Sequence, residues 1–239
     1  MNILVTGANG FLGREIIQEL ESENKIFGFS TSSNPKRNKS HLKRINSLEE
    51  IKPEDFINID VFIHTANIAH KRISKEDYLQ VEEVNLRYTS RLFHLACDAK
   101  VKNIIFLSSV AVYGSDTESQ DIYEDTIANP DNFYGICKLK SELELNKLAI
   151  NNSSLITILR MPMVFGKDSP GSTALLRRLL SKRFYFPLII PDNGNRRTLC
   201  NAKLLGKTIK MIFSMKNPPF ILNVCNVDTV STYEIIKAY

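Results

Sequence analysis

A tyrosine and a lysine four residues apart, Tyr134 and Lys138 in the run YGICK, have the side chains best suited to proton transfer. On a helix, positions i and i+4 share a face, so phenol and ammonium can point into one pocket. A free tyrosine has a pKa near ~10, and a base active near neutrality needs a pKa about 3 units lower. A fixed lysine charge beside it, together with the positive charge of a ligand in the same pocket, supplies much of that lowering. The pair therefore predicts an acid/base site, with an ordinary surface tyrosine–lysine pair as the alternative.

A serine upstream strengthens the catalytic interpretation. Ser109 directly follows the apolar run 101–108 and begins the stretch SVAVYG. A hydroxyl at the carboxyl end of a parallel strand faces the ligand crevice, where it can bond a substrate oxygen and share a proton with Tyr134. Without its neighbours the same serine would be a strand-end cap. We predict that Ser109, Tyr134 and Lys138 form the catalytic set.

Three glycines at the start of the chain predict a phosphate-binding turn. They stand in GANGFLG, between the apolar strand 2–6 and a helix with apolar residues at helical spacing. Gly7 permits a tight turn, Gly10 lets a pyrophosphate approach the backbone, and Gly13 lets the helix pack close to the strand. The helix N-terminus then offers N–H groups and a positive dipole end to phosphates. We expect a dinucleotide on a cradle made of Gly7, Gly10, Phe11, Leu12 and Gly13.

The end of the second expected strand, 25–29, bears on which dinucleotide binds. A carboxylate there binds the ribose 2′-hydroxyl of NAD, whereas a basic residue tolerates the 2′-phosphate of NADP. This chain has Ser30, which we expect to contact the cofactor, and the first basic residues after it are Lys36 and Arg37. The pattern favours NADP, or no preference between NAD and NADP, but the charges of Lys36 and Arg37 are equally consistent with a solvated loop. The expected cofactor is NAD or NADP.

Strands and helices alternate through the first 160 residues. The expected strands are apolar runs without period-two alternation, which is typical of a parallel sheet covered on both faces. We predict an α/β fold, a Rossmann-type doubly wound parallel sheet in residues 1–168, and a small partial substrate-binding region in 169–239, part of which returns to the first domain. The remaining expected strands are 59–66, 101–108, 154–160 and 220–224, and the expected helices are 76–99, 133–150, 173–182 and 202–214. A further helix expected near Ser231 is cut short, so we expect a fragment or a shortened protein.

Composition limits the partners. The net charge of +5 comes without any basic run interleaved with aromatics, so we expect no nucleic acid but an anionic small substrate. No apolar stretch approaches the ~18 residues of a membrane span, and no signal peptide precedes the first strand. The four cysteines are far apart and form no CxxC pair, so we expect reduced thiols, no metal site and a cytoplasmic location.

In order, these motifs resemble the extended short-chain dehydrogenase/reductase family, and more narrowly its nucleotide-sugar epimerase/dehydratase group. The likeness runs from Asn2 to about Val230. It implies that IHTA, ending at Ala66, lies under the cofactor, and that Asn85 supports the active-site backbone or the cofactor. It implies that Pro162 lies near the nicotinamide. The run NRRT resembles a segment whose arginine binds a nucleotide diphosphate, making Arg197 the candidate, with a surface-loop arginine as the alternative.

The resemblance also implies the reaction. Tyr134 would take the C4 hydroxyl proton of a nucleotide sugar while a hydride moves to the nicotinamide. The resemblance of the NRRT segment implies that the sugar is UDP-linked. Dehydratase relatives carry Asp-Glu after the hydroxyl residue, whereas Val110, expected to contact substrate, and Ala111 stand here and cannot transfer protons. We expect an NAD(P)-dependent 4-epimerase of UDP-hexose or UDP-N-acetylhexosamine in bacterial surface-polysaccharide synthesis.

Two alternatives remain open. One is an NADPH-dependent reductase of a UDP-4-keto sugar, toward which the missing carboxylate after Phe29 tilts. The other is a dinucleotide-binding protein with impaired catalysis, toward which the short C-terminus tilts. Relatives often dimerise through a four-helix bundle, which here implies a homodimer built from residues 76–99 and 133–150.

Overall fold

The computed structural model describes residues 1–31, 41–68, 77–115, 121–170, 196–231 and 234. The expected helix 173–182, most of the expected helix near Ser231, and the basic residues Lys36 and Arg37 lie outside these ranges.

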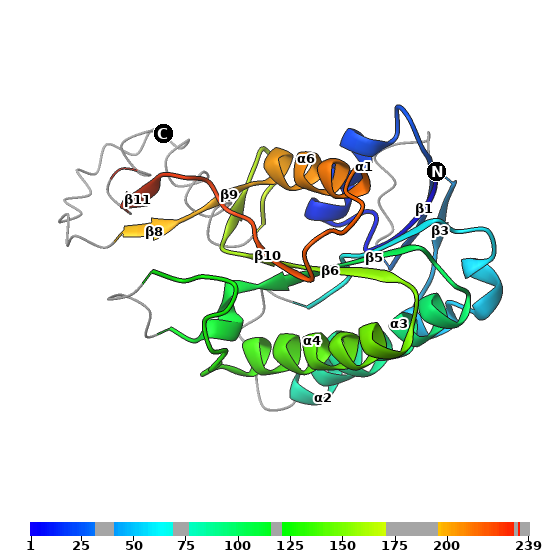
Figure 1. Cartoon of the computed structure of the whole chain (residues 1–239), viewed down its shortest axis with the longest axis horizontal. Helices are drawn as coiled ribbons and strands as arrows, with labels where there is room; N and C mark the ends of the chain where they lie inside the picture. The colour runs from blue at the N-terminus through cyan, green and yellow to red at the C-terminus, as the bar shows by residue number, and fades with distance from the viewer. Residues whose placement is uncertain (32–40, 69–76, 116–120, 171–195, 232–233, 235–239) are drawn as a thin grey trace.

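Seven parallel strands form the central sheet (Figure 1), and the sequence predicts its parallel character and each of its strands except the one at residues 41–44. Their order is β10-β6-β5-β4-β1-β2-β3, with β1 in the inner part of the sheet and the strand order reversing between β1 and β4. At such a reversal the carboxyl ends of the strands open a crevice. The bounds are β1 (Asn2–Thr6), β2 (Lys25–Ser30), β3 (His41–Arg44), β4 (Val61–His64), β5 (Asn103–Ser109), β6 (Leu155–Met161) and β10 (Ile221–Asn223).

Helices cover both faces of the sheet (Figure 1). On one face α1 (Phe11–Leu20) packs beside α6 (Ala202–Phe213). On the other lie α2 (Asp77–Glu82), α3 (Thr89–Asp98) and α4 (Phe133–Asn151). Successive residues of β1 belong to different cores, because Ile3 and Val5 pack with α1 and α6 while Leu4 packs with α3 and α4. Burial on both faces explains the continuous apolar runs of the strands.

The expected helix 76–99 is interrupted. Between α2 and α3, residues Glu83–Tyr88 form the π-helical turn η3. The remaining short helices are η1 (Leu48–Glu50), η2 (Pro53–Phe56) and η4 (Val110–Tyr113). None of the helices in the described ranges combines the length and the apolar character that a bilayer crossing requires.

Beyond β6 the chain forms two small sheets that the sequence pattern did not predict. β7 (Val164–Phe165) pairs in parallel with β9 (Cys200–Asn201). β8 (Arg196–Thr198) pairs antiparallel with β11 (Thr229–Ser231). These strands have two or three residues each, which is too short for a periodic signal.

Candidate active site

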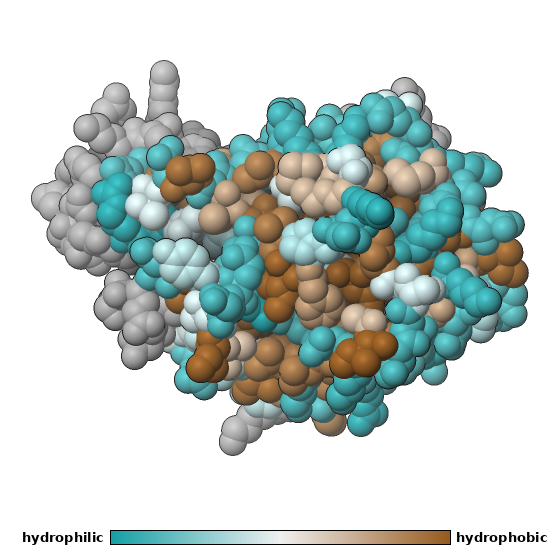
Figure 2. All heavy atoms as spheres, viewed as in Figure 1, coloured by the Kyte–Doolittle hydropathy of each residue, from teal (hydrophilic) through white to brown (hydrophobic). Residues whose placement is uncertain are grey.

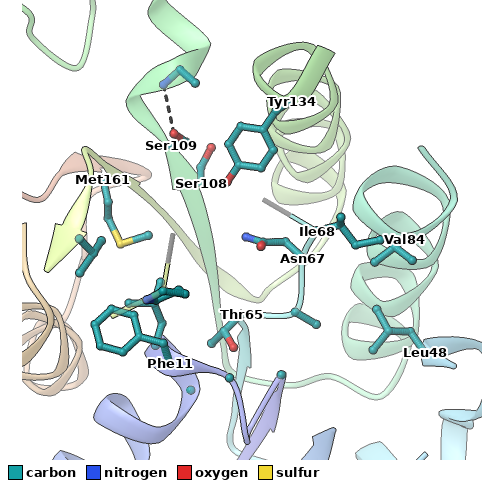
Figure 3. Close-up of a pocket in the computed structure, with 18 of the residues that line it drawn as sticks. Phe11, Leu48, Thr65, Asn67, Ile68, Val84, Ser108, Ser109, Tyr134 and Met161 are labelled. Atoms are coloured by element: carbon teal, nitrogen blue, oxygen red, sulfur yellow. Dashed lines mark hydrogen bonds between the residues drawn. The ribbon is translucent and has the colours of Figure 1, made fainter. Parts of the chain in front are cut away.

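A cavity of about 1020 Å³ lies at the carboxyl ends of β1, β4 and β5 and reaches the start of α1 (Figure 3). Most of the predicted site residues line it: Gly7, Gly10, Phe11, Leu12, Gly13, Ser30, Ala66, Ser109, Val110, Tyr134 and Pro162. Three do not, namely Asn85, Lys138 and Arg197.

The glycine turn has the geometry of a phosphate cradle. Gly7 adopts φ +70°, and a Cβ there would lie 2.6 Å from Thr65 Oγ1, so this position requires glycine. Gly10 N donates to Gly7 O at 2.8 Å, which closes the turn. Gly10 is also the N-cap of α1 and supplies no side-chain cap, so the first-turn N–H groups face the cavity uncapped. This arrangement fits the pyrophosphate of a dinucleotide.

The far end of the cavity is lined by small polar side chains. Ser30 ends β2 and Thr31 follows it, and Asn46 and Ser47 lie shortly after β3. Glu83 of η3 is the one carboxylate lining the cavity among the described residues, and it accepts a hydrogen bond from Tyr88 Oη at 3.0 Å. This end therefore carries hydroxyl and amide groups suited to a ribose.

Tyr134 lies in the first turn of α4. Asn132 caps this helix by accepting a hydrogen bond from Gly135 N at 2.9 Å, which sets the start of the helix at the cavity. The Tyr134 hydroxyl points toward the end of β5, where Ser108 and Ser109 lie (Figure 3). The phenol and the Ser109 hydroxyl therefore lie on the same part of the wall, as predicted.

The protonation of Tyr134 differs from the expectation. Burial raises the pKa of Tyr134 to about 12, and a hydrogen bond with Ser109 opposes this only in part. The protein groups alone do not produce the expected lowering, because loss of hydration outweighs the hydrogen bond with Ser109. A phenolate at this position requires further positive charge in the cavity.

Lys138 lies behind the cavity wall and not in it. Its side chain is 2% exposed, and Nζ donates to Leu107 O at 2.8 Å. The ammonium lies 4.5 Å from the centre of the Phe106 ring and 5.8 Å from that of Tyr134. Burial lowers the pKa of Lys138 to about 7. The expectation that both side chains point into one pocket is therefore corrected. The lysine side chain turns toward β5, and its ammonium lies behind the Tyr134 ring and outside the cavity.

Ser109 fulfils both interpretations of its position. Its Oγ accepts a hydrogen bond from Ala111 N at 3.1 Å, which caps η4, and the residue also lines the cavity. A hydroxyl oxygen that accepts from the backbone keeps its own proton to donate. The cap therefore fixes the oxygen and leaves the hydrogen available to a ligand.

Asn85 supports the cavity from outside. It is buried in η3, where its Oδ1 accepts from Ile68 N at 2.8 Å and its Nδ2 donates to Ile68 O at 2.9 Å. Ile68 lines the cavity, so Asn85 fixes backbone of the cavity wall without lining the cavity itself. Arg197 lies at an exposed position of strand β8 and does not line the cavity.

A buried ion pair beside the site escaped the sequence reasoning. Arg160 of β6 donates from Nη2 to Glu142 Oε2 at 2.6 Å, and Ser108 donates a short hydrogen bond to the other carboxylate oxygen. Both ionic side chains are at most 5% exposed. The available signal was position: Glu142 stands four residues after Lys138, on the same helix face.

His64, at the end of β4, has a packing role, because both of its ring nitrogens contact buried threonine hydroxyls. Nδ1 lies 2.6 Å from Thr6 Oγ1, and Nε2 lies 2.9 Å from Thr89 Oγ1. Burial lowers the pKa of His64 to about 3, so the ring is neutral near neutral pH.

The parallel sheet, the uncapped glycine turn and the Tyr134–Ser109 wall together define a Rossmann-type enzyme that uses a nicotinamide dinucleotide. The sequence profile of the NAD dependent epimerase/dehydratase family matches residues 3–224. The chain belongs to this family and is an NAD-dependent sugar-nucleotide epimerase/oxidoreductase.

Individual relatives are similar over almost the whole chain. A UDP-glucose 4-epimerase of Vibrio cholerae is 28% identical over 99% of this chain and 74% of its own length. A UDP-glucuronic acid 4-epimerase from Bacillus cereus, solved in complex with NAD, superposes with a TM-score of 0.84 at 25% identity, over 99% of this chain and 82% of its own. A UDP-N-acetylglucosamine 4-epimerase from Methanobrevibacter ruminantium M1 shares the fold, with a TM-score of 0.86 at 23% identity, covering 99% and 80%.

Proposed function

We propose that this chain is an NAD(P)-dependent 4-epimerase of a UDP-hexose or UDP-N-acetylhexosamine, acting through transient oxidation at C4. One observation carries the proposal: Tyr134, Ser109 and the glycine turn line a single cavity. A dinucleotide on the turn and a sugar beside Tyr134 would therefore share one enclosed space. The 4-epimerase relatives from Vibrio cholerae and Bacillus cereus support the choice of reaction.

The protein groups divide the work. The turn from Gly7 to Gly13 would hold the pyrophosphate, and Ser30 would face the adenosine ribose. When bound, the nicotinamide supplies the acceptor and later the donor of a hydride. Tyr134 Oη would remove the proton of the C4 hydroxyl and return it in the reverse step. Ser109 would donate a hydrogen bond to the same sugar oxygen.

The walls of the cavity also limit the reaction. Val110 lines the cavity directly after Ser109 and has no proton to transfer. We therefore place this chain among enzymes that oxidise and reduce the sugar, without elimination of water. Val110 would contact the sugar. We further propose that Arg197 and region 169–239 bind the nucleotide diphosphate, where a guanidinium matches phosphate geometry.

A second function is favoured by one observation. Ser30 stands at the end of β2, where NAD-specific proteins carry a carboxylate. An NADPH-dependent reductase of a UDP-4-keto sugar would use the same Tyr134 and Ser109, with proton donation in place of proton removal.

Proton NMR of UDP-glucose and of UDP-N-acetylglucosamine, each incubated with protein and catalytic NAD, tests the proposal. We expect the axial C4 product to reach equilibrium without net consumption of NAD. Oxidation of stoichiometric NADPH with a 4-keto sugar, and no epimer, would favour the reductase. If the protein binds NAD but forms neither the epimer nor the reduced sugar, it would be a binding protein. A role in supplying the epimer for surface-polysaccharide synthesis would then be excluded.

We also propose a homodimer in which residues 77–98 and 133–151 of two copies pack together. Ile136, Leu143 and Ile150 recur every seven residues along α4 and are 36%, 51% and 77% exposed. Apolar residues lie over this helix along the lower edge of the molecule (Figure 2). Such a stripe matches the seam of an antiparallel helix pair. Sedimentation equilibrium should show a dimer for the native chain and a monomer for Leu143→Glu. A native monomer would exclude this interface.

A further inference from the structure

Three polar contacts attach α4 to the end of β5, and together they place the proton-transfer groups. Tyr134 contacts Ser109, Lys138 Nζ donates to Leu107 O, and Glu142 accepts from the Ser108 hydroxyl. The three helix residues are spaced by four, so they form one stripe on the face toward the sheet. Glu142 is the member of this stripe that stands farthest along α4 from Tyr134 and the only one with a negative charge.

Both oxygens of the Glu142 carboxylate accept hydrogen bonds from buried side chains. Arg160 Nε lies 3.1 Å and 3.2 Å from its two oxygens, and Arg160 Nη2 lies 2.6 Å from Oε2. Arg160 Nη1 donates to Tyr113 Oη at 2.9 Å, and Tyr113 Oη donates to Asn223 Oδ1 at 2.9 Å. The carboxylate is therefore anchored to β6, and through Tyr113 to β10. A buried charge held from several sides keeps a single position.

We propose that Glu142 is a positioning residue for the reaction: its carboxylate, fixed by Arg160 and Ser108, keeps Lys138 charged and fixes α4 against β5. The inference rests on the proposed function, since it assigns Lys138 to the support of Tyr134. It adds a residue that touches neither the cavity nor its contents. Its position one helical turn beyond Lys138 explains why a costly buried ion pair stands here.

The charges around Lys138 favour this role. Burial is the largest influence on the pKa of Lys138 and lowers it, whereas Glu142 and, less strongly, Cys137 raise it. From β4, His64 is neutral at pH 7 because its own pKa lies near 3. From β5, Leu107 O accepts a hydrogen bond from Nζ, and the Phe106 ring lies 4.5 Å from the ammonium. Arg160 of β6 is paired with Glu142, so among the described groups that carboxylate is the principal charge stabilising the ammonium.

A titration of the lysine itself tests the inference without substrate. In protein labelled with ¹⁵N-lysine, the Nζ resonance of Lys138 is the one missing from Lys138→Met. We expect Glu142→Gln to lower the Lys138 midpoint by about one pH unit or more. Glu144→Gln is the matched control, because Glu144 stands two residues further on α4 and pairs with Lys147 at the surface. Equal midpoints in native protein and Glu142→Gln would overturn the inference.

The pH dependence of turnover provides a second readout. A lower pKa means that Lys138 loses its proton at lower pH, so the alkaline limb of kcat should move down in Glu142→Gln and stay in place in Glu144→Gln. An unshifted limb would contradict the proposed role. If the native protein makes no epimer, the proposed function is overturned, but the role of Glu142 is not. The NMR titration of Lys138 would then test the role of Glu142 by itself.

Glu142→Gln leaves the buried Arg160 guanidinium unpaired, so a loss of folding in this variant would come from Arg160 and not from Lys138. The double variant Glu142→Leu/Arg160→Met removes both charges and avoids that penalty. Of the two groups, Glu142 is the one that raises the pKa of Lys138. The double variant should therefore also lower the Lys138 midpoint, and an unchanged midpoint would again overturn the inference.

Discussion

Asn85 grips the backbone of Ile68 at both polar groups, accepting from its N–H at 2.8 Å and donating to its C=O at 2.9 Å. The backbone carbonyl of Asn85 in turn accepts a hydrogen bond from Ser141 Oγ at 2.9 Å. One residue of the π-helical turn thus ties the cavity wall after β4 to the helix that carries Tyr134.

This double contact predicts a binding defect from a residue outside the cavity. Asn85→Ala leaves both Ile68 groups without their partner, so we expect roughly tenfold weaker NAD binding and a stability loss of about 1–3 kcal/mol. Calorimetric titration with NAD and urea unfolding measure the two effects. Arg87→Ala, at an exposed position of the same turn, is the control. Native affinity in Asn85→Ala would show that Asn85 does not support the cofactor site.

Loss of the Tyr134 hydroxyl should remove turnover and spare cofactor binding. Tyr134→Phe keeps the ring and deletes the proton-transfer group, so kcat should fall by about 10²–10⁴-fold. The NAD dissociation constant should stay within about threefold, since phosphates and not the phenol anchor the dinucleotide. Tyr123→Phe, at a tyrosine that is 60% exposed, should behave like the native chain. A kcat within tenfold of native in Tyr134→Phe would assign the proton transfer to another residue.

Two glycines of the turn should respond differently to alanine. A Cβ on Gly10 would meet only Gly7 O, at 3.0 Å, so Gly10→Ala should fold but reduce NAD affinity roughly tenfold or more by crowding the pyrophosphate. A Cβ on Gly13 would collide with the Gly7 carbonyl and with Ala8, so Gly13→Ala should also lose about 2 kcal/mol or more of stability. Equal stability losses in both variants would contradict this division of roles.

His64 should make stability depend on pH below neutrality. Its pKa is about 3 in the folded protein, against 6.5 for the ordinary ring, because burial disfavours the cation. The unfolded chain therefore takes up the proton first, and stability is fully present above pH 6.5 and declines as the pH falls toward 3. Between pH 6.5 and 5 the loss should be about 2 kcal/mol by urea unfolding. His64→Gln should flatten this slope; an identical slope would exclude His64 as its source.

The sequence predicted the sheet and the cofactor turn because both are local patterns. Apolar runs bounded by turns gave strands such as 2–6 and 101–108, and the spacing of Gly7, Gly10 and Gly13 placed the turn at the start of α1. Ser109 and Tyr134 were also predicted to share a wall, since the carboxyl end of a strand and the start of the next helix adjoin in this topology.

Other features depend on contacts that no local pattern encodes. Glu142 and Arg160 are separated by 18 residues and meet only because α4 packs over β5 and β6. The raised pKa of Tyr134 follows from burial, which a residue spacing does not specify. Lys138 was expected in the cavity because helix periodicity fixes the face of a side chain but not the direction of its long stem.

The fate of the C4 hydrogen tests the proposed reaction most directly. UDP-glucose and UDP-N-acetylglucosamine carrying deuterium at C4 would be incubated with the protein and catalytic NAD, and the products analysed by NMR and mass spectrometry. In a transient oxidation, the hydrogen on C4 moves to the nicotinamide and returns to C4, so the axial product should keep its deuterium. The variant Tyr134→Phe should form no axial product. Epimer that has exchanged its deuterium with solvent, or a complete absence of epimer from NAD-bound native protein, would contradict the mechanism.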